Sequence, residues 1–153
     1  MSKDYGTVPI SDQLEMSGLA FVRGLASGQL PLNTLARTLG YDVVEAGEGR
    51  VVVSALASHE HLNPSGTIHG GIAATLLDTC MGLAIRTLVD KGRSSTTLEF
   101  KISFLKPIRV DMGPLRAEGV VLNCGRRIGT AEGRLTDPSG MLLAHGTTTC
   151  LIT

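Results

Sequence analysis

The chain has 153 residues, a length that suits one domain with a sizeable hydrophobic core. Lys plus Arg and Asp plus Glu both count 14, so nothing global points to nucleic acid or to a membrane surface as a partner. Aromatic residues are scarce and Trp is absent, which disfavours a stacking platform for single-stranded nucleic acid.

Three features of the sequence bear on location. The first residues, MSKDYGTVPISDQ, lack the apolar core of a secretory signal. The longest apolar stretch, Ile72 to Val89, is interrupted by Asp78 and Arg86 and makes a poor transmembrane candidate. The three cysteines are odd in number and lack CxxC spacing, which favours a reducing compartment over a disulfide framework. We therefore predict a cytoplasmic protein.

Two helices are predicted before residue 41. Ser11 to Ala26 carries apolar side chains on one side, with Ser11 as the candidate N-cap and Gly28 as the end. Pro31 to Leu39 predicts a second, shorter helix, which Gly40 would close.

After residue 40, the chain alternates strand patterns with one long apolar helix. The predicted elements are two paired strands, a helix and four further strands: 41–45, 50–57, 71–89, 95–104, 115–122, 128–136 and 141–152. This order predicts an α+β fold with a largely antiparallel sheet.

The strand 95–104 shows the clearest alternation of side chains between two faces. One face is expected to carry Thr97, Glu99, Lys101 and Ser103. The other face is expected to carry Leu98, Phe100, Ile102 and Phe104. The alternation predicts a β-strand.

The most informative stretch, NPSGTIHGGIAATLLD, runs from Asn63 to Asp78. A Pro- and Gly-rich loop leads into the long helix, and the helix carries one carboxylate, Asp78. Exposed N–H groups at a helix N-terminus stabilise negative charge, and a carboxylate near such donors is a device for acyl transfer.

Asp78 falls on a narrow stripe of the predicted helix with Gly71, Thr75 and Gly82. The opposite face is apolar and carries Ala73, Leu76, Leu77, Cys80, Ala84 and Leu88. One interpretation is an Asp that bonds a neighbouring group and has no further role. The other is a site, because the two glycines leave room for a ligand or another chain beside the acid. Since one sheet covers only one side of a helix, we expect a second chain to cover this stripe.

These residues resemble the hotdog-fold acyl-CoA thioesterases, in particular the phenylacetic-acid-degradation-type (PaaI-like) branch. The resemblance rests on Asn63, the HGG that begins at His69, Asp78, the strand 97–107 and the ending 137–149. It implies a long central helix wrapped by a curved antiparallel sheet. The hotdog domain would then occupy residues 40–153, and residues 1–39 would form an N-terminal helical extension. The resemblance also implies a homodimer with composite sites that assembles into a homotetramer, a dimer of dimers.

The resemblance further implies a role for each motif residue. Asp78 would be the catalytic carboxylate, acting as a general base or as a nucleophile. The backbone N–H of Gly70 would polarise the thioester carbonyl, and Asn63 and His69 would orient substrate or water. Thr97 would approach from the partner subunit. His69 is equally compatible with a simple role as a hydrogen-bond anchor for the loop.

Four further residues are predicted to contact the substrate. Gly71 and Thr79 lie beside the motif residues, and Arg126 and Arg127 share a turn. Arginine forks suit the phosphates of coenzyme A, although such pairs are usually solvated. Thr96 is the alternative to Thr97 as the hydroxyl in the site. Coenzyme A is part of the substrate, so no cofactor is expected.

We predict hydrolysis of a small acyl-CoA. Analogy with the family that the chain resembles suggests an aromatic acyl group. The alternatives are a non-catalytic acyl-CoA-binding protein and a hydratase on the same fold. His59 and His61 lie two apart and could share a metal, but no third ligand is evident, so no metal is predicted. His145 is expected to be structural.

Overall fold

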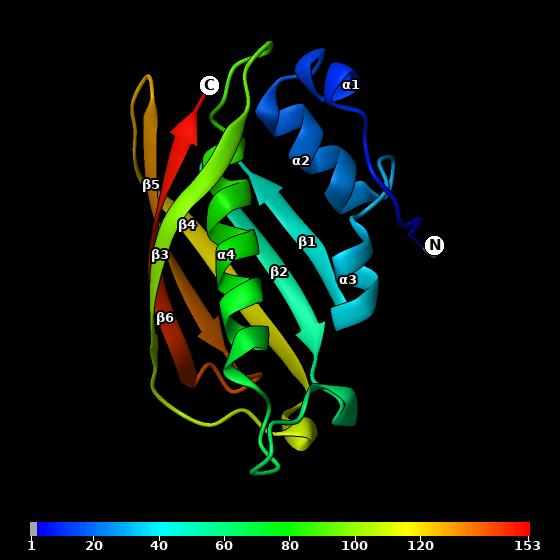
Figure 1. Cartoon of the computed structure of the whole chain (residues 1–153), viewed down its shortest axis with the longest axis vertical. Coiled ribbons are helices and arrows are strands. Elements are labelled where there is room, and N and C mark those ends of the chain that lie inside the picture. Colours follow the sequence, from blue (N-terminus) through cyan, green and yellow to red (C-terminus); the bar gives the residue numbers. More distant parts are fainter. Residues whose placement is uncertain (1–2) are drawn as a thin grey trace.

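A six-stranded antiparallel sheet frames the molecule in the computed structural model, which describes residues 3–153 (Figure 1). The strands are β1 Tyr41–Gly47, β2 Arg50–Leu56, β3 Ser95–Phe104, β4 Pro114–Cys124, β5 Ile128–Thr136 and β6 Leu142–Ile152. Their order across the sheet is β1-β2-β4-β5-β6-β3, so β1 and β3 are its edges.

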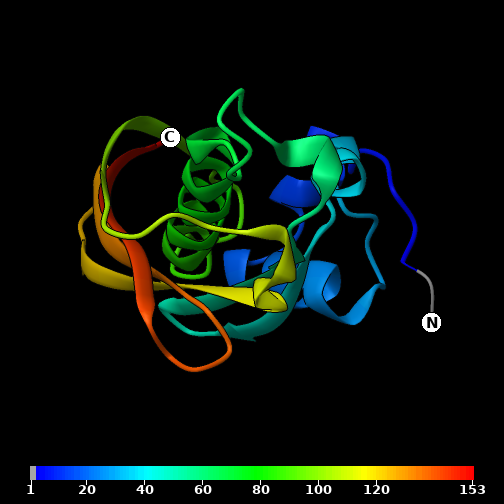
Figure 2. The same cartoon turned by 90° about the horizontal axis from the view of Figure 1, so that it is seen from below.

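One long helix lies in the hollow of this sheet. The helices are α1 Ile10–Leu14, α2 Gly18–Ser27, α3 Thr34–Leu39 and α4 Gly70–Arg86, with short 3₁₀ turns η1 His59–His61 and η2 Val110–Met112. Figure 2 looks along α4 and shows the sheet curving around it. The α+β architecture predicted from the sequence is therefore confirmed. Among residues 3–153, no helix is long and apolar enough to cross a bilayer.

Small residues on the sheet let α4 approach it closely. A Cβ atom on Gly119 of β4 would lie 2.4 Å from the backbone carbonyl of Cys80 in α4. A Cβ on Gly133 of β5 would lie 2.9 Å from Cγ of Met81. The helix side chains that fill the remaining space, including Leu77 and Met81, are fully buried. The backbone of α4 is thus fixed against the middle of the sheet.

The N-terminal helices differ from the prediction in one respect. The single helix expected over 11–26 is two helices, because α1 ends at Leu14 and α2 begins at Gly18. Ser17, rather than Ser11, caps α2, and its Oγ accepts the Ala20 N–H at 3.2 Å. The N–H of Gly18 also donates to the Val89 carbonyl at 2.9 Å, just past the end of α4. This contact joins two segments far apart in sequence.

The N-terminal helices share the core of the sheet and α4. Val22 and Leu25 of α2, Leu32 and Ala36 belong to the same cluster of buried apolar residues as α4. Figure 1 shows α2 beside β1, next to the open side of α4. The extension therefore covers part of α4 that the sheet leaves free.

The expected alternation in β3 is wrong at its beginning. The register with β6 pairs Thr97 with Cys150 and Glu99 with Thr149, so Leu98 is an extra residue in a β-bulge. Beyond the bulge Ile102 packs on the core, and Phe104 lies against Gly70 of α4. Before the bulge it is Thr97 that faces α4. The bulge therefore puts Thr97 on the same face as the apolar residues, not opposite them.

Candidate active site

Asp78 lies on α4, half-buried, and meets a hydroxyl group from β3. Oγ1 of Thr97 donates a hydrogen bond to Oδ1 of Asp78 at 2.9 Å. Sγ of Cys150, on β6, lies 3.8 Å from the same Thr97 oxygen. Among residues 3–153, no Lys or Arg forms an ion pair with Asp78. The acid is thus held by one neutral donor and keeps its second oxygen for another partner.

This contact corrects the expectation that Thr97 approaches Asp78 from a partner subunit. Both residues belong to one chain, and the bulge at Leu98 is the physical reason, because it turns Thr97 toward α4. Thr96, the alternative hydroxyl, is exposed. Thr97 is therefore the hydroxyl beside the acid.

The predicted stripe on α4 is confirmed as its less buried side. Gly71 is exposed, and Thr75, Asp78 and Gly82 are half-buried. On the opposite face, the predicted apolar residues are buried except for Leu88, which is half-buried. The sheet covers one side of the helix, and the Asp78 stripe faces away from that cover.

The N-terminus of α4 is capped by a side chain and has a free backbone N–H group. His69 is the N-cap, and its Nδ1 accepts the N–H of Gly71 at 2.8 Å. His69 therefore has at least the anchoring role that the sequence left open. The N–H of Gly70 meets no backbone or side-chain acceptor within the described residues. Gly70 is thus the available donor at this helix end.

The loop before α4 is fixed by Asn63. Its Oδ1 accepts the N–H of Ser65 at 2.9 Å and that of Thr67 at 3.3 Å. Its Nδ2 donates to Oγ1 of Thr67 at 2.8 Å. Both ends of the amide are used inside the loop, so Asn63 positions the segment that carries His69 and Gly70.

The two halves of the predicted site do not meet within one chain. Gly70 and Asp78 are eight residues apart on α4, and an α-helix rises about 12 Å over eight residues. One thioester carbonyl cannot lie within hydrogen-bond distance of both groups of the same chain. The structure brings Asp78 to Thr97 and places His69 beside Gly70 at the N-terminus of α4, while Asn63 bonds within the preceding loop.

A cavity of about 490 Å³ opens beside Asp78. Its lining on the α4 and β3 side includes Thr79, Gly82 and Thr97. Its opposite wall comes from the N-terminal extension and β1, with Thr7, Gln13, Phe21, Leu25, Asn33, Tyr41 and Val43. Sequence reasoning placed Thr79 in the site but missed the extension, because nothing in the sequence pairs residues 6–33 with α4.

A second hollow, of about 340 Å³, lies beside the free N–H of Gly70. Phe104, Ile108 and the exposed Lys106 line it. Sequence reasoning did not single out Lys106, and the signal that could have found it is its position two residues after the strand that carries Thr97.

Arg126 and Arg127 are exposed in the turn between β4 and β5. The carbonyl of Arg126 accepts a 2.6 Å hydrogen bond from Nη2 of Arg93. A third hollow, of about 380 Å³, is lined there by Leu88 and Val89, which follow the C-terminal end of α4. Within one chain, the two arginines therefore lie at the end of α4 opposite Gly70.

The remaining candidates have local roles. His61 is buried, and its Nδ1 accepts the N–H of Ser58 at 3.2 Å, so it closes the η1 turn. Nε2 of His145 lies 3.8 Å from Glu132 on the next strand. Burial raises the pKa of the Cys80 thiol, which keeps that group neutral.

Comparison with known proteins finds a family model and relatives that match this chain. The thioesterase superfamily model matches residues 65–144. An esterase candidate of Halobacterium salinarum is 36% identical over 107 residues, covering 66% of this chain and 68% of that protein. Human acyl-coenzyme A thioesterase 13 is 29% identical over 112 residues, covering 72% of this chain and 79% of that protein. The structure of a phenylacetic-acid-degradation-related protein of Ralstonia eutropha superposes with a TM-score of 0.77 at 28% identity, covering 86% of this chain and 98% of that one.

Proposed function

The chain belongs to the thioesterase superfamily and is a thioester hydrolase, and we propose that Asp78 attacks a small acyl-CoA through a water molecule. The observation that carries the proposal is the Asp78–Thr97 contact at the mouth of a cavity. The hydroxyl of Thr97 holds one carboxylate oxygen, which leaves the other free to take a proton from water. Direct attack by the carboxylate, through a mixed anhydride, is the competing mode.

The carbonyl oxygen of the thioester would bind at the N-terminus of α4. The free N–H of Gly70 supplies a donor there, and the helix dipole favours the negative charge that develops on the oxygen. Because Gly70 and Asp78 are about 12 Å apart along one helix, this arrangement needs the Gly70 of one chain and the Asp78 of another. We propose a dimer in which each site combines both chains.

The coenzyme A portion would meet basic residues at the surface. Lys106 lies beside Gly70, and Arg126 and Arg127 lie at the far end of α4 in the same chain. In a dimer with antiparallel α4 helices, this far end would approach the Gly70 of the second chain. We propose that these residues contact the phosphates of coenzyme A.

The test is thiol release from a panel of acyl-CoAs by the protein and its Asp78→Asn variant. We expect release by the parent and a loss of at least ~10²-fold in kcat for the variant, with an unchanged melting temperature. Asp90→Asn, at an exposed acid just past α4, is the matched control. A folded Asp78→Asn variant with parental kcat would overturn the assignment. Binding of acyl-CoA without thiol release by the parent would favour the non-catalytic alternative.

The mode of attack is separable by one turnover in ¹⁸O-labelled water with enzyme in excess. A general base puts ¹⁸O only into the product acid. A nucleophilic carboxylate puts one ¹⁸O into Asp78 and leaves the product acid unlabelled when water attacks the Asp78 carbon of the mixed anhydride, so label in Asp78 identifies this mode.

A further inference from the structure

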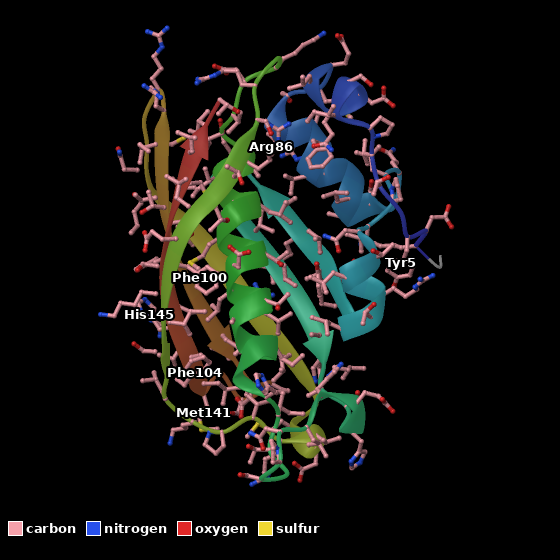
Figure 3. All side chains as sticks on the ribbon, in the orientation of Figure 1. Tyr5, Arg86, Phe100, Phe104, Met141 and His145 are labelled. Carbon is pink, nitrogen blue, oxygen red and sulfur yellow. The ribbon has the colours of Figure 1, made fainter. Side chains whose placement is uncertain are left out.

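The cavity beside Asp78 ends at a buried arginine that the thioesterase chemistry does not use. Arg86 is the last residue of α4 and is only 4% exposed. Figure 3 shows it at the end of α4, on the side of α2. Its Nη1 donates to the Arg93 carbonyl at 2.6 Å, and its guanidinium carbon lies 5.4 Å from the centre of the Phe21 ring.

The rest of the guanidinium has no partner. Nε and Nη2 are buried and form no hydrogen bond within residues 3–153, and no carboxylate of that range pairs with Arg86. Leaving buried donors on a charged group unpaired is costly, and the contact with Phe21 offsets only part of that cost. Burial also lowers the pKa of Arg86.

The helix aligns this cation with the catalytic acid. Asp78, Gly82 and Arg86 are spaced by four residues and follow one face of α4, and all three line the cavity. A Cβ at Gly82 would lie 3.7 Å from Oγ1 of Thr97, so its absence leaves open space between the acid and the arginine. The apolar side chains of Leu25 and Val43 also line the cavity.

These observations describe a site with a reactive end, an apolar middle and a cationic end. We propose, resting on the proposed function, that Arg86 binds a carboxylate at the far end of the acyl group. The preferred substrates are then coenzyme A monothioesters of dicarboxylic acids. Nε and Nη2 form one edge of the guanidinium plane, and this edge can bind a carboxylate through two parallel hydrogen bonds.

The distances set an approximate chain length. Asp78 and Arg86 are separated by a helical rise of about 12 Å, part of which their own side chains span. An extended chain covers about 1.2 Å per bond, so a diacid of about six to eight carbons fits the remainder. Both free nitrogens are covered in this structure and the Phe21 ring lies over the guanidinium, so side chains around Arg86 must shift when the carboxylate docks.

The experiment compares substrates that differ only at the far end of the acyl group. We measure kcat/KM for adipyl-CoA against hexanoyl-CoA and for suberyl-CoA against octanoyl-CoA. We expect kcat/KM to be at least about 10-fold higher for the carboxylated member of one pair. The methyl-terminated substrate is disfavoured because it leaves the buried donors of Arg86 unpaired. Preference for the methyl-terminated member of both pairs overturns the proposal.

Variants of the arginine assign the preference to it. Arg86→Met keeps the aliphatic stem and removes the charge, so the ratio of the two kcat/KM values should fall at least about 10-fold. Arg86→Lys keeps the charge without the fork and should give an intermediate ratio. Arg23→Met, at an exposed arginine of α2, is the matched control and should leave the ratio at the parental value.

The remaining outcomes are distinguishable. If Arg86 only anchors α2 or pairs with an acid of a second copy, Arg86→Met lowers stability or dissociates the dimer while the ratio stays constant, and the proposal fails. Hydrolysis of methyl-terminated acyl-CoAs alone overturns this inference but leaves the proposed function standing. If no substrate releases thiol, the proposed function fails. A thermal-shift measurement then decides whether Arg86 binds a carboxylate, because free suberate should raise the melting temperature of the parent and not that of Arg86→Met.

Discussion

At the scale of single residues, Gly70 is constrained by a neighbour rather than by its own backbone. Its φ is not positive, so its backbone conformation does not by itself require glycine. A Cβ at Gly70 would instead lie 3.1 Å from Cε1 of Phe104, whose side chain is mostly exposed and can yield. Glycine at position 70 therefore keeps open the space between the free N–H and the ring of Phe104.

We predict that Gly70→Ala lowers kcat at least about 10-fold with little loss of melting temperature, because the methyl group and the displaced ring crowd the carbonyl. Steady-state thiol release and thermal unfolding measure the two effects. Gly70→Ala combined with Phe104→Leu should recover part of the activity, since the smaller side chain gives space back. A large loss of stability with parental kcat would mean that Gly70 serves only the fold.

Single residues also show what the sequence could and could not predict about the site. The spacing of the motif was enough to place Asp78 on the open stripe of α4 and Gly70 at its N-terminus. Thr97 was assigned to the wrong face of its strand, because a bulge is not visible in an alternating pattern. The pair of Phe21 and Arg86 depends on a contact between residues 65 positions apart, which no local pattern encodes.

At the scale of elements, the packing of α4 on β4 depends on one close approach. A Cβ at Gly119 would lie 2.4 Å from the carbonyl carbon and oxygen of Cys80, both backbone atoms that cannot rotate away. We predict that Gly119→Ala lowers the free energy of unfolding by about 1–3 kcal/mol through overpacking, as measured by urea denaturation. Gly47→Ala is the control, because its nearest atom is 3.8 Å away. Equal, small effects of both variants would show that α4 shifts freely.

A second element-scale feature is a cluster of four charges across β1, β2 and β4. Arg50 contacts Glu45 at 2.8 Å and Glu118 at 3.0 Å, and Arg116 contacts the same two acids at 2.8 and 3.2 Å. Hydrogen bonds from Arg116 and then Arg50 lower the pKa of Glu45, and those from Arg50 first lower the pKa of Glu118. Val52 lies between the two acids in the strand register and is fully buried.

The sign of the pH effect follows from these lowered pKa values. The cluster stabilises the fold fully above the ordinary value of 4.5, and the stabilisation is lost as pH falls through the lower pKa of the folded state. Because the groups are partly exposed, we expect Glu118→Gln to cost only about 0.5–1 kcal/mol at pH 7. In urea titrations the difference from the parent should shrink as pH falls below 4.5, whereas the exposed control Glu60→Gln should match the stability of the parent at each pH. A constant difference at all pH values would show that packing, not charge, is lost.

The elements themselves were predicted well where local chemistry decides them. The bounds of β3 and β5 agree with the expectation, since each is flanked by strong turn residues, and Gly28 and Gly40 end their helices with positive φ. The break between α1 and α2 was missed because the N–H of Gly18 is satisfied by the carbonyl of Val89. That acceptor is supplied by the tertiary structure and not by the neighbouring sequence.

At the scale of the whole molecule, β3 is an open edge with an apolar surface. Leu98, Phe100 and Phe104 are exposed on this edge strand, and Figure 3 places the two phenylalanines along it. An unpaired, apolar edge strand is a template for pairing with another chain. Pairing through β3 would also bring a second copy toward the less buried stripe of α4, which is the cover that the proposed composite site needs.

Complementation between inactive chains tests this composite site. In a dimer that combines the Gly70 of one chain with the Asp78 of the other, mixing Asp78→Asn with Gly70→Ala chains gives a heterodimer with one intact site. Activity per chain should then exceed that of either parent variant after exchange. Mixing Asp78→Asn with Thr97→Val should give no recovery, because Asp78 and Thr97 lie in one chain and belong to the same half of the site. Recovery in the second mixture, or none in the first despite demonstrated exchange of chains, would contradict this arrangement.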